Sequence, residues 1–550
     1  MERQYVMGVC AGRHGSAALL CDGRVTVAVD EQRIRRDRDG EAPGGGALRY
    51  CLDSAGITWD DVALLVHTDV GPPPGQDAGV PDHVRRTAVT RQMAHAYAAA
   101  TMSTFHNAAV AVLCRPSGDH AGAGAPAGRG GNDAAPAGPD WLYALADGRL
   151  VAPPRHDGDL AGGGPAALVE FHERVSGYLF GSADDCGQLA ALAARGQPGG
   201  FAARSGGDGP GGGGSARGRV AAAPSLLDEL DPSRSAANRG GPPGADLQYH
   251  ADVARWAQDL LGDAVLGLLD AWYPRYPSSN LVYAGDLTGN AVLNRLIATR
   301  TPFGQVFVQP VAGSAGAAVG CCHYGWVEVL GETAPPQHDS ELVVGRRYTA
   351  DRLARVAGSA AARPDLAVDE PVDLPGRVAA LLAEGAAVGW FEGGSELGSR
   401  SLGQRSVLAA AGSVSARERL GRITGRPDFA PPPVIVRAED CAAVFDLPDL
   451  SRHQVLSATI RPAWADALPA AAHADGTAVV QCVTGSSHRR LHQLLAAWSR
   501  LSESPVLLNE RLGPFGAPLL ETPEQALALL TGTPLDALVL HGYLIRKVGR

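Results

Sequence analysis

Two arginines and the small residues around them form the segment of the sequence best suited to binding an anion. Arg400 and Arg405 are five positions apart, with Gly398 and Gly403 before them and Ser406 after. Guanidinium forks bind phosphate oxygens in pairs, glycines let the backbone approach a ligand, and a hydroxyl adds a donor. The pattern favours a site for a phosphorylated ligand. The alternative is that the arginines form salt bridges between domains.

Two glycine-containing loops in the first half of the chain follow predicted strands and precede predicted helices. Their residues are Gly285, Asp286, Gly289 and Asn290 in one loop, and Gly313, Ser314 and Gly316 in the other. Free N–H groups and the positive end of a helix dipole meet at such a turn, which suits a nucleotide or another phosphorylated ligand. On spacing alone, these glycines could equally serve tight turns and close helix packing.

The hydrophobic periodicity predicts the strands and helices that position these residues. A hairpin is expected over residues 5–34, and a helix over 248–272. A capping-box pattern at Thr522 begins a helix that reaches Leu530. Further strands are expected at residues 108–113, 280–284, 305–308, 386–391, 478–483, 505–509 and 536–540. Strands alternating with helices indicate an α/β fold.

With 550 residues, the chain is too long for a single ordinary core. We expect an N-terminal domain over residues 1–345, with glycine-rich inserts at about 116–139 and 196–218. A linker at 346–375 and a C-terminal domain at 376–550 would follow.

Composition narrows the classes of partner. A formal net charge of -10 argues against a general nucleic-acid-binding surface, which needs a basic stripe. No apolar run is long enough for a membrane span, and residues 5–10 are too short for the core of a signal peptide. Nine dispersed cysteines fit reduced thiols better than a disulfide framework. We therefore expect a cytoplasmic protein without nucleic-acid or membrane partners.

Several collinear segments resemble one family. Residues 389–406 read GWFEGGSELGSRSLGQRS and resemble the GWFQGRMEFGPRALGNRS signature of the carbamoyltransferases, which include nodulation, cephamycin, novobiocin and tobramycin O-carbamoyltransferases. Residues 309–316, QPVAGSAG, are similar to QPAAGDAG. Residues 505–509, PVLLN, are similar to the family's VPVLLNTSFN.

This resemblance implies an N-terminal domain with the actin-like fold of the tRNA threonylcarbamoyl transferase and a C-terminal YrdC-like α/β domain. ATP and carbamoyl phosphate would be the substrates that form carbamoyl-adenylate in the C-terminal domain. An acceptor hydroxyl would then attack at an iron-containing site in the N-terminal domain. The residues expected to bind ATP and carbamoyl phosphate are Arg400, Gly403, Arg405, Ser406, Arg426 and Asn509, while the two glycine loops would face the nucleotide or adenylate.

The positions that match the family's iron ligands carry unsuitable side chains. Where the family has HHxxH, residues 91–95 read RQMAH, so that Arg91 replaces a ligand and His95 remains. Cys114 and Ser314 stand where the family has aspartates. Two positive unit charges about 4 Å apart repel each other by roughly 4 kcal/mol at an effective dielectric near 20, and the repulsion between a guanidinium and a metal dication is about twice that. We therefore expect no iron, and His95 becomes the candidate general base.

Charged groups are also missing elsewhere. Residues 424–431 read TGRPDFAP in place of KxREWFRPFAP, which leaves Arg426 but removes at least one basic group. Glu510 stands where a small hydroxyl would face phosphate, and Gln188 replaces a lysine.

Three hypotheses follow. The first is a carbamoyltransferase of specialised-metabolite or antibiotic biosynthesis that acts on a small-molecule hydroxyl or amine, with Arg400, Arg405 and His95 as catalytic residues. The second is an inactive member that serves as a partner or regulatory subunit. The third is an enzyme that transfers another acyl group. A homo-oligomer or a complex with a partner enzyme is compatible with each.

Overall fold

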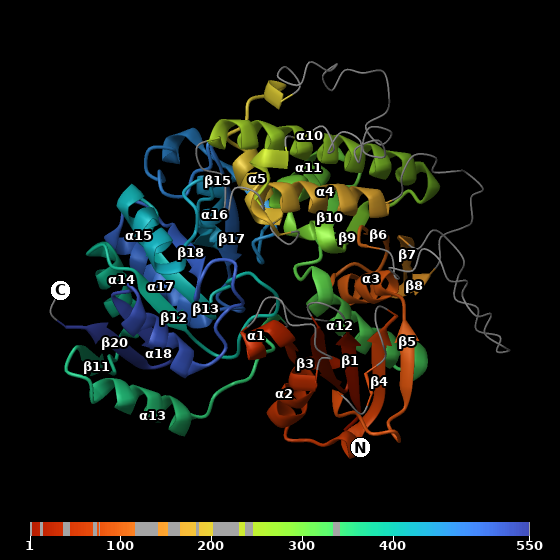
Figure 1. Cartoon of the computed structure of the whole chain (residues 1–550), viewed down its shortest axis with the longest axis horizontal. Coiled ribbons are helices and arrows are strands. Elements are labelled where there is room, and N and C mark those ends of the chain that lie inside the picture. The colour runs from red at the N-terminus through yellow and green to blue at the C-terminus, as the bar shows by residue number, and fades with distance from the viewer. Residues whose placement is uncertain are drawn as a thin grey trace. The chain divides into compact units, whose positions relative to one another are not determined.

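The computed structural model describes most of the chain, and the described residues form two compact units (Figure 1). The first unit comprises Met1–Glu31, Glu41–Leu189 and Gly196–His338, and the second comprises Gln32–Gly40, Ala190–Arg195 and Asp339–Arg550. The described residues are 3–11, 15–36, 45–69, 74–75, 78–115, 141–151, 165–182, 186–201, 230, 232–236, 246–333 and 342–548. The predicted insert at 116–139 and most of that at 196–218 lie outside them.

Within its described residues, the first unit contains two five-stranded sheets with the same topology. The first sheet, in the order β3-β2-β1-β4-β5, consists of β1 (Tyr5–Cys10), β2 (Ser16–Cys21), β3 (Arg24–Asp30), β4 (Val62–Thr68) and β5 (Arg86–Val89). The second, in the order β10-β9-β6-β7-β8, consists of β6 (Ala108–Val112), β7 (Leu142–Ala146), β8 (Arg149–Val151), β9 (Asn280–Ala284) and β10 (Gln305–Val308).

In both sheets the three strands that come first in the sequence form an antiparallel meander. The fourth strand in the sequence pairs in parallel with the first, and the fifth pairs in parallel with the fourth. A sheet pattern that occurs twice in this way is the hallmark of the actin-like fold. The expected actin-like domain is confirmed.

Helices pack against these sheets at short distances that small residues permit. In the part of this unit that the structure describes, the helices that begin here are α1 (Glu31–Arg35), α2 (Gly45–Ala55), α3 (Arg91–Met102), α4 (Pro165–Phe180), α5 (Cys186–Ala193), α10 (Leu247–Trp272), α11 (Ala291–Arg300) and α12 (Gly313–Tyr324). A Cβ on Gly320 of α12 would overlap the carbonyl oxygen of Ala94 in α3. A Cβ on Gly8 of β1 would overlap that of Ala318. Helix α12 is therefore buried between α3 and the first sheet.

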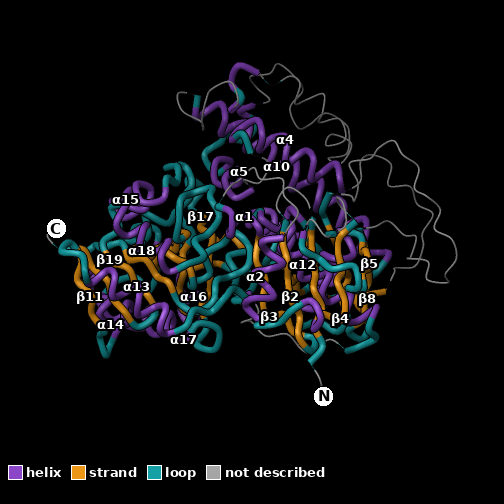
Figure 2. The backbone as a smooth tube through the Cα atoms, turned by 60° about the horizontal axis from the view of Figure 1, so that its bottom comes forward, coloured by secondary structure: helices purple, strands orange, loops and turns teal. Residues whose placement is uncertain are grey.

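The second unit is built on one ten-stranded mixed sheet, whose strands are drawn in orange in Figure 2. The order is β11-β20-β19-β12-β13-β18-β14-β17-β16-β15. The strands are β11 (Leu366–Asp369), β12 (Val388–Phe391), β13 (Arg405–Ala410), β14 (Val434–Arg437), β15 (Phe445–Asp446), β16 (Leu456–Ile460), β17 (Thr477–Val483), β18 (Leu507–Arg511), β19 (Ala537–Leu540) and β20 (Tyr543–Lys547).

Alternate residues of this sheet enter two separate cores, because successive side chains of a strand point to opposite faces. Trp390 and Leu408 belong to the core that α14 and α17 cover, whereas Phe391 and Val407 belong to the other. The helices of this unit are α13 (Ala350–Ala361), α14 (Leu374–Ala383), α15 (Val414–Thr424), α16 (Ala438–Val444), α17 (Arg489–Leu501) and α18 (Pro523–Gly532).

The segment predicted as a linker, residues 346–375, is folded within the second unit. It includes α13 and β11, and β11 pairs with β20 in an antiparallel register that joins Leu366 to Lys547. The second unit is thus an α/β domain that begins before residue 376, and its YrdC-like character stays a prediction. Among the helices of the described residues, none combines the length and hydropathy needed to cross a membrane.

Candidate functional site

Parallel strands of the first unit end near several polar side chains. Asp69 follows β4, Cys114 follows β6, and Gly285 and Asp286 follow β9. Ligands of α/β folds bind outside the carboxyl ends of parallel strands. The structure therefore brings the sequence-predicted residues Asp286 and Cys114 to an edge where a ligand site is expected.

An ion pair occupies this edge. Arg91, the first residue of α3, donates from Nη2 to Oδ1 of Asp286 at 2.8 Å, and both side chains are less than a fifth exposed. The other carboxylate oxygen accepts the N–H of Arg115 at 3.0 Å. Burial would raise the pKa of Asp286, but Arg91 outweighs it and holds this pKa below its ordinary value. Burial would lower the pKa of Arg91, but the negative charge of Asp286 outweighs this effect, and the pKa of Arg91 is raised. Both groups are charged at neutral pH.

His95 of α3 lies in the same neighbourhood and is fully buried. Its Nδ1 is 3.2 Å from Oε1 of Gln309, and that oxygen also accepts the N–H of Gly285 at 3.1 Å. A backbone N–H can only donate, so the amide oxygen of Gln309 is fixed as the acceptor and Nδ1 of His95 carries the proton. Burial lowers the pKa of His95 to about 4. The imidazole is therefore neutral, and its Nε2, which has no hydrogen-bond partner among the described residues, holds the lone pair.

These residues do not fit a divalent iron. Burial raises the pKa of Cys114, so its thiol stays protonated, and Ser314, near the start of α12, offers a half-buried neutral hydroxyl. Arg91 brings a positive charge, and Asp286 is neutralised by it. Among the described residues, no group of three or more His, Cys, Asp or Glu side chains could hold a metal. The donor set offers one imidazole, that of His95, and one carboxylate, which is already paired with Arg91, and this is too few of the ligands that iron prefers.

Packing accounts for part of the two glycine loops. Gly285 has φ 104, and a Cβ there would overlap the carbonyl oxygen of Leu113. Asn290 caps α11 by accepting the N–H of Leu293 at 3.0 Å, and its amide donates to Oε1 of Gln258 at 2.8 Å. These residues hold the loop in shape, and their predicted contact with a nucleotide stays a prediction. The same holds for Gly289, Gly313 and Gly316.

In the second unit, a buried carboxylate shapes the loop between β12 and β13. Oε1 of Glu396 accepts three backbone N–H groups, those of Leu402 at 2.6 Å, Arg405 at 3.2 Å and Gln404 at 3.3 Å. Its side chain is fully buried. One acceptor with three donors is a strong constraint on backbone conformation, because each unpaired buried N–H would cost about 1–3 kcal/mol.

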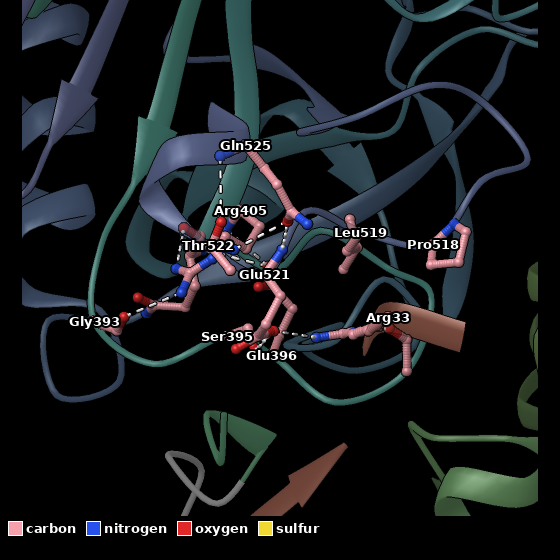
Figure 3. A network of polar contacts seen from close by, with 12 residues as sticks. Arg33, Gly393, Ser395, Glu396, Arg405, Pro518, Leu519, Glu521, Thr522 and Gln525 are labelled. Carbon is pink, nitrogen blue, oxygen red and sulfur yellow. Dashed lines mark hydrogen bonds and ion pairs between the residues drawn. The ribbon is translucent and has the colours of Figure 1, made fainter. Parts of the chain in front are cut away.

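Arg405 closes the same loop from the first position of β13. It is fully buried, and its fork donates to three carbonyl oxygens: Glu392 at 2.8 Å, Gln404 at 3.0 Å and Gly393 at 3.3 Å. Figure 3 shows Arg405 beside Gly393. Its guanidinium carbon lies 3.6 Å from the centre of the Phe391 ring. In this arrangement the fork binds the protein's own backbone, so Arg405 holds the loop in position.

Asn509 and Ser406 also lie beneath this loop. Nδ2 of Asn509 donates to the carbonyl of Ser401 at 2.9 Å and to Oε1 of Gln481 at 3.1 Å. Ser406 is fully buried, and its hydroxyl has no hydrogen-bond partner among the described residues. Gly403 has φ 103, where a side chain would overlap Leu491. The structure thus brings these predicted ligand-binding residues together around the loop between β12 and β13, where most of their contacts stabilise the loop.

Arg426 is paired inside the unit. Its guanidinium contacts the carboxylate of Glu510, with Nη2 3.3 Å from Oε1, and lies 4.5 Å from the centre of the Phe515 ring. Glu510 is fully buried. The acidic residue that departs from the family pattern therefore neutralises an arginine that the sequence suggested as an anion ligand.

Arg400 has basic neighbours that the sequence pattern did not reveal. Burial lowers the pKa of His453 to about 3, and His488, Arg452 and Arg400 lower it further. His488 contacts the side chain of Gln404 at 2.9 Å. These contributions place His488, Arg452 and Arg400 around His453, and because burial lowers the pKa of both imidazoles, Arg400 and Arg452 are the positive charges that an anion would meet here. We call Arg400, Arg452, His453 and His488 the basic cluster. Their separation in sequence, with no shared motif, explains why sequence reasoning missed three of them.

Comparisons with known proteins match both halves of the chain. The family model described as carbamoyltransferase N-terminus matches residues 236–322, and that described as carbamoyltransferase C-terminus matches 379–547. Both parts of the carbamoyltransferase family thus match this chain, in the order in which the family has them, and the chain is similar to transferases.

The matches to individual relatives cover different shares of this chain. It is 26% identical over 593 residues to nodulation protein NolNO of Sinorhizobium fredii, spanning 97% of this chain and 79% of that protein. It is 28% identical over 304 residues to NolO of Bradyrhizobium diazoefficiens, spanning 54% and 55%. It is 32% identical over 212 residues to 3'-hydroxymethylcephem-O-carbamoyltransferase of Streptomyces clavuligerus, spanning 38% of each. The chain thus spans about half or less of the last two relatives.

Proposed function

We propose that this protein uses ATP and carbamoyl phosphate to transfer a carbamoyl group to a hydroxyl or amine of a small-molecule acceptor. The observation that carries the proposal is that both carbamoyltransferase family models match, in order, along one chain. The name of the cephem relative states an O-carbamoyl transfer, which supports a hydroxyl acceptor in specialised metabolism.

The basic cluster of the second unit is our candidate for binding the phosphorylated donor. Arg400 is half-buried, and Arg452 is exposed, so a ligand can reach both. The loop that carries Arg400 is held by Glu396 and Arg405, as described above. A loop fixed in this way presents its cation without the entropy loss of ordering it on binding. Arg400 would contact phosphate, while Arg405 and Asn509 act as positioning residues.

In the first unit, His95 is the candidate base for the acceptor. Its neutral imidazole has Nε2 as a proton acceptor, which is buried, so the acceptor molecule would reach it only after a local opening of the structure, and the contact to Gln309 fixes the ring. The hydroxyl proton of the acceptor would move to Nε2 as the oxygen attacks the carbamoyl carbon. Because the residues present do not fit iron, no step of this proposal uses a metal, and Arg91 supplies a positive charge nearby.

Isothermal titration with ATP, with carbamoyl phosphate and with both tests the donor site. We expect heat of binding for the wild type and at least a tenfold weaker affinity for Arg400→Ala, since charge-assisted hydrogen bonds contribute about 1.5–3 kcal/mol. Arg422→Ala, an exposed arginine of α15, is the matched control and should bind like the wild type. Turnover of both substrates with an alcohol acceptor then tests transfer. No heat with any ligand would contradict the proposal.

A second candidate function is that of a catalytically inactive partner or regulatory subunit. It is favoured by the two ion pairs Arg91–Asp286 and Arg426–Glu510, which neutralise positive charges near both candidate sites. Binding of nucleotide without turnover would support this alternative. Turnover with another acyl donor, but none with carbamoyl phosphate, would support the transfer of a different group.

A further inference from the structure

Two cysteines of the second unit lie side by side although they are 41 positions apart. Cys441 belongs to α16 and Cys482 to β17. Their Sγ atoms are 2.6 Å apart, whereas non-bonded heavy atoms are most stable at about 3.5–4.0 Å. A disulfide bond measures about 2.04 Å, so about half an ångström separates the two sulfurs from a covalent bond.

The backbone holds these side chains together. Strand β14 pairs in parallel with β17, with Val436 beside Cys482, and α16 begins directly after β14. Cys441 is thus one helical turn beyond a strand hydrogen-bonded to the strand of Cys482. The N–H of Cys482 also donates to the carbonyl of Ser451 at 2.7 Å. The proximity of the two sulfurs is therefore a property of the sheet.

Burial restricts the reagents that can reach the pair. Cys441 is 1% exposed and Cys482 is 2% exposed, and both lie in one of the two apolar cores of this unit. A bulky disulfide reagent cannot align with a sulfur in that position, whereas a molecule of the size of hydrogen peroxide can enter through small fluctuations of the structure.

We propose that Cys441 and Cys482 form a reversible disulfide in response to a hydroperoxide. The sulfur of Cys482 attacks one oxygen of hydrogen peroxide, the O–O bond breaks, and the leaving hydroxide takes the thiol proton of Cys482 and departs as water, so that Cys482 becomes a sulfenic acid. The sulfur of Cys441 then attacks the sulfur of Cys482, the S–O bond breaks, and the oxygen leaves as water with the proton of Cys441. Two thiols are oxidised and one peroxide is reduced.

The assignment of the attacking sulfur agrees with the local electrostatics. The hydrogen bond between the two groups lowers the pKa of Cys482, although burial opposes it, and the charge of Arg452 acts in the same direction as the bond. The same bond, together with burial, raises the pKa of Cys441. Outside the pair, the charge of Arg452 favours the thiolate of Cys482 and that of Asp440 disfavours the thiolate of Cys441, so Cys482 is the better nucleophile.

Oxidation would cross-link parts of the unit that support the loop carrying Arg400. Gln481, next to Cys482, donates to the carbonyl of Leu402 at 2.8 Å. A bond between α16 and β17 closes the intervening chain into a covalent loop and lowers the entropy of the unfolded state. We expect the oxidised unit to be the more stable one.

To test this, folded wild-type protein is treated with hydrogen peroxide and the reaction is quenched in acid. The protein is then unfolded, and its remaining thiols are alkylated and counted by mass spectrometry. The chain has nine cysteines, so we expect two fewer alkyl groups than in the reduced protein. We also expect a peptide pair joined through Cys441 and Cys482, and reversal by dithiothreitol. The Tm should rise by several degrees on oxidation.

Variants locate the bond. Cys441→Ala and Cys482→Ala should lose the cross-link and the Tm shift, whereas Cys51→Ser, a buried cysteine of the first unit, should keep both. If either alanine variant fails to fold, the presence or absence of the cross-linked peptide pair in the wild type is sufficient to test the proposal. Alkylation of both cysteines after peroxide, or a sulfinic acid on Cys482 without a cross-link, would overturn the proposal.

Discussion

Arg91 and Asp286, 195 positions apart in sequence, form an ion pair of 2.8 Å at the strand ends of the first unit. One lies at the start of α3 and the other directly after β9. The pair places a fixed positive charge and its counter-ion beside His95, at a position where the family resemblance implies a metal. The charge of the site is therefore set by two side chains of the chain itself.

This pair makes a measurable contribution to the stability of the first unit. Arg91→Met leaves the carboxylate of Asp286 without its partner, and we expect a loss of about 3 kcal/mol in the free energy of unfolding. A double-mutant cycle with Asp286→Asn should give a coupling energy of about 1–3 kcal/mol. The exposed pair Arg255–Asp259 is the control, with an expected coupling of about 0.3–0.5 kcal/mol. Equal coupling in both cycles would show that the buried pair has no special role.

The stability of the first unit should fall in mild acid because of buried histidines. Burial lowers the pKa of His323 from 6.5 to about 4, and the folded state therefore favours the neutral ring. Its contribution is complete above pH 6.5 and is lost as the pH falls toward 4, at most about 3 kcal/mol by linkage. His172 is shifted in the same direction.

His323→Leu should make this pH dependence shallower in urea unfolding experiments between pH 7.5 and 4. Neither ring nitrogen has a hydrogen-bond partner among the described residues, so at pH 7.5 the variant should be as stable as the wild type or more stable. His106→Gln, at an exposed position, should leave the slope unchanged. An unchanged slope in His323→Leu would contradict the assignment.

Gln309 should determine which nitrogen of His95 carries the proton. In the wild type, ¹⁵N NMR of labelled imidazole should show a protonated Nδ1 and an unprotonated Nε2 for His95, because Gln309 accepts at Nδ1. Gln309→Leu removes the acceptor and should give a mixture of tautomers. It also leaves the N–H of Gly285 unpaired, which should cost about 1–3 kcal/mol. Protonated Nε2 in the wild type would rule out His95 as the base in this arrangement.

Glu396 should be necessary for the shape of the loop that presents Arg400. Glu396→Ala removes the acceptor of three N–H groups, and we expect a loss of about 3 kcal/mol together with weaker donor binding. Glu396→Gln keeps an amide oxygen at the same position and should be milder in both measurements. Glu418→Ala, at an exposed position of α15, is the control. Unfolding can be followed by tryptophan fluorescence, to which buried Trp390 of this unit contributes.

The sequence by itself predicted much of the local structure. The strands at 280–284 and 305–308 have the predicted bounds. The helix predicted at 248–272 is α10, Leu247–Trp272, and Thr522 caps α18 with the predicted capping box. Periodicity and capping depend on neighbours within a few residues, so they can be read from the chain. The family motifs also identified the actin-like fold.

Tertiary structure decided which charges and thiols meet. The sequence marked Arg405 and Arg426 as anion ligands, but the fold surrounds the first with backbone carbonyls and pairs the second with Glu510. Local pattern also gave no sign that Cys441 and Cys482 would be neighbours. Such contacts depend on which strands pair across the sheet, and a residue's type does not specify its partner. The sequence determined the elements and the chemical groups they carry, whereas their pairing across the fold determined which groups stay available to a ligand.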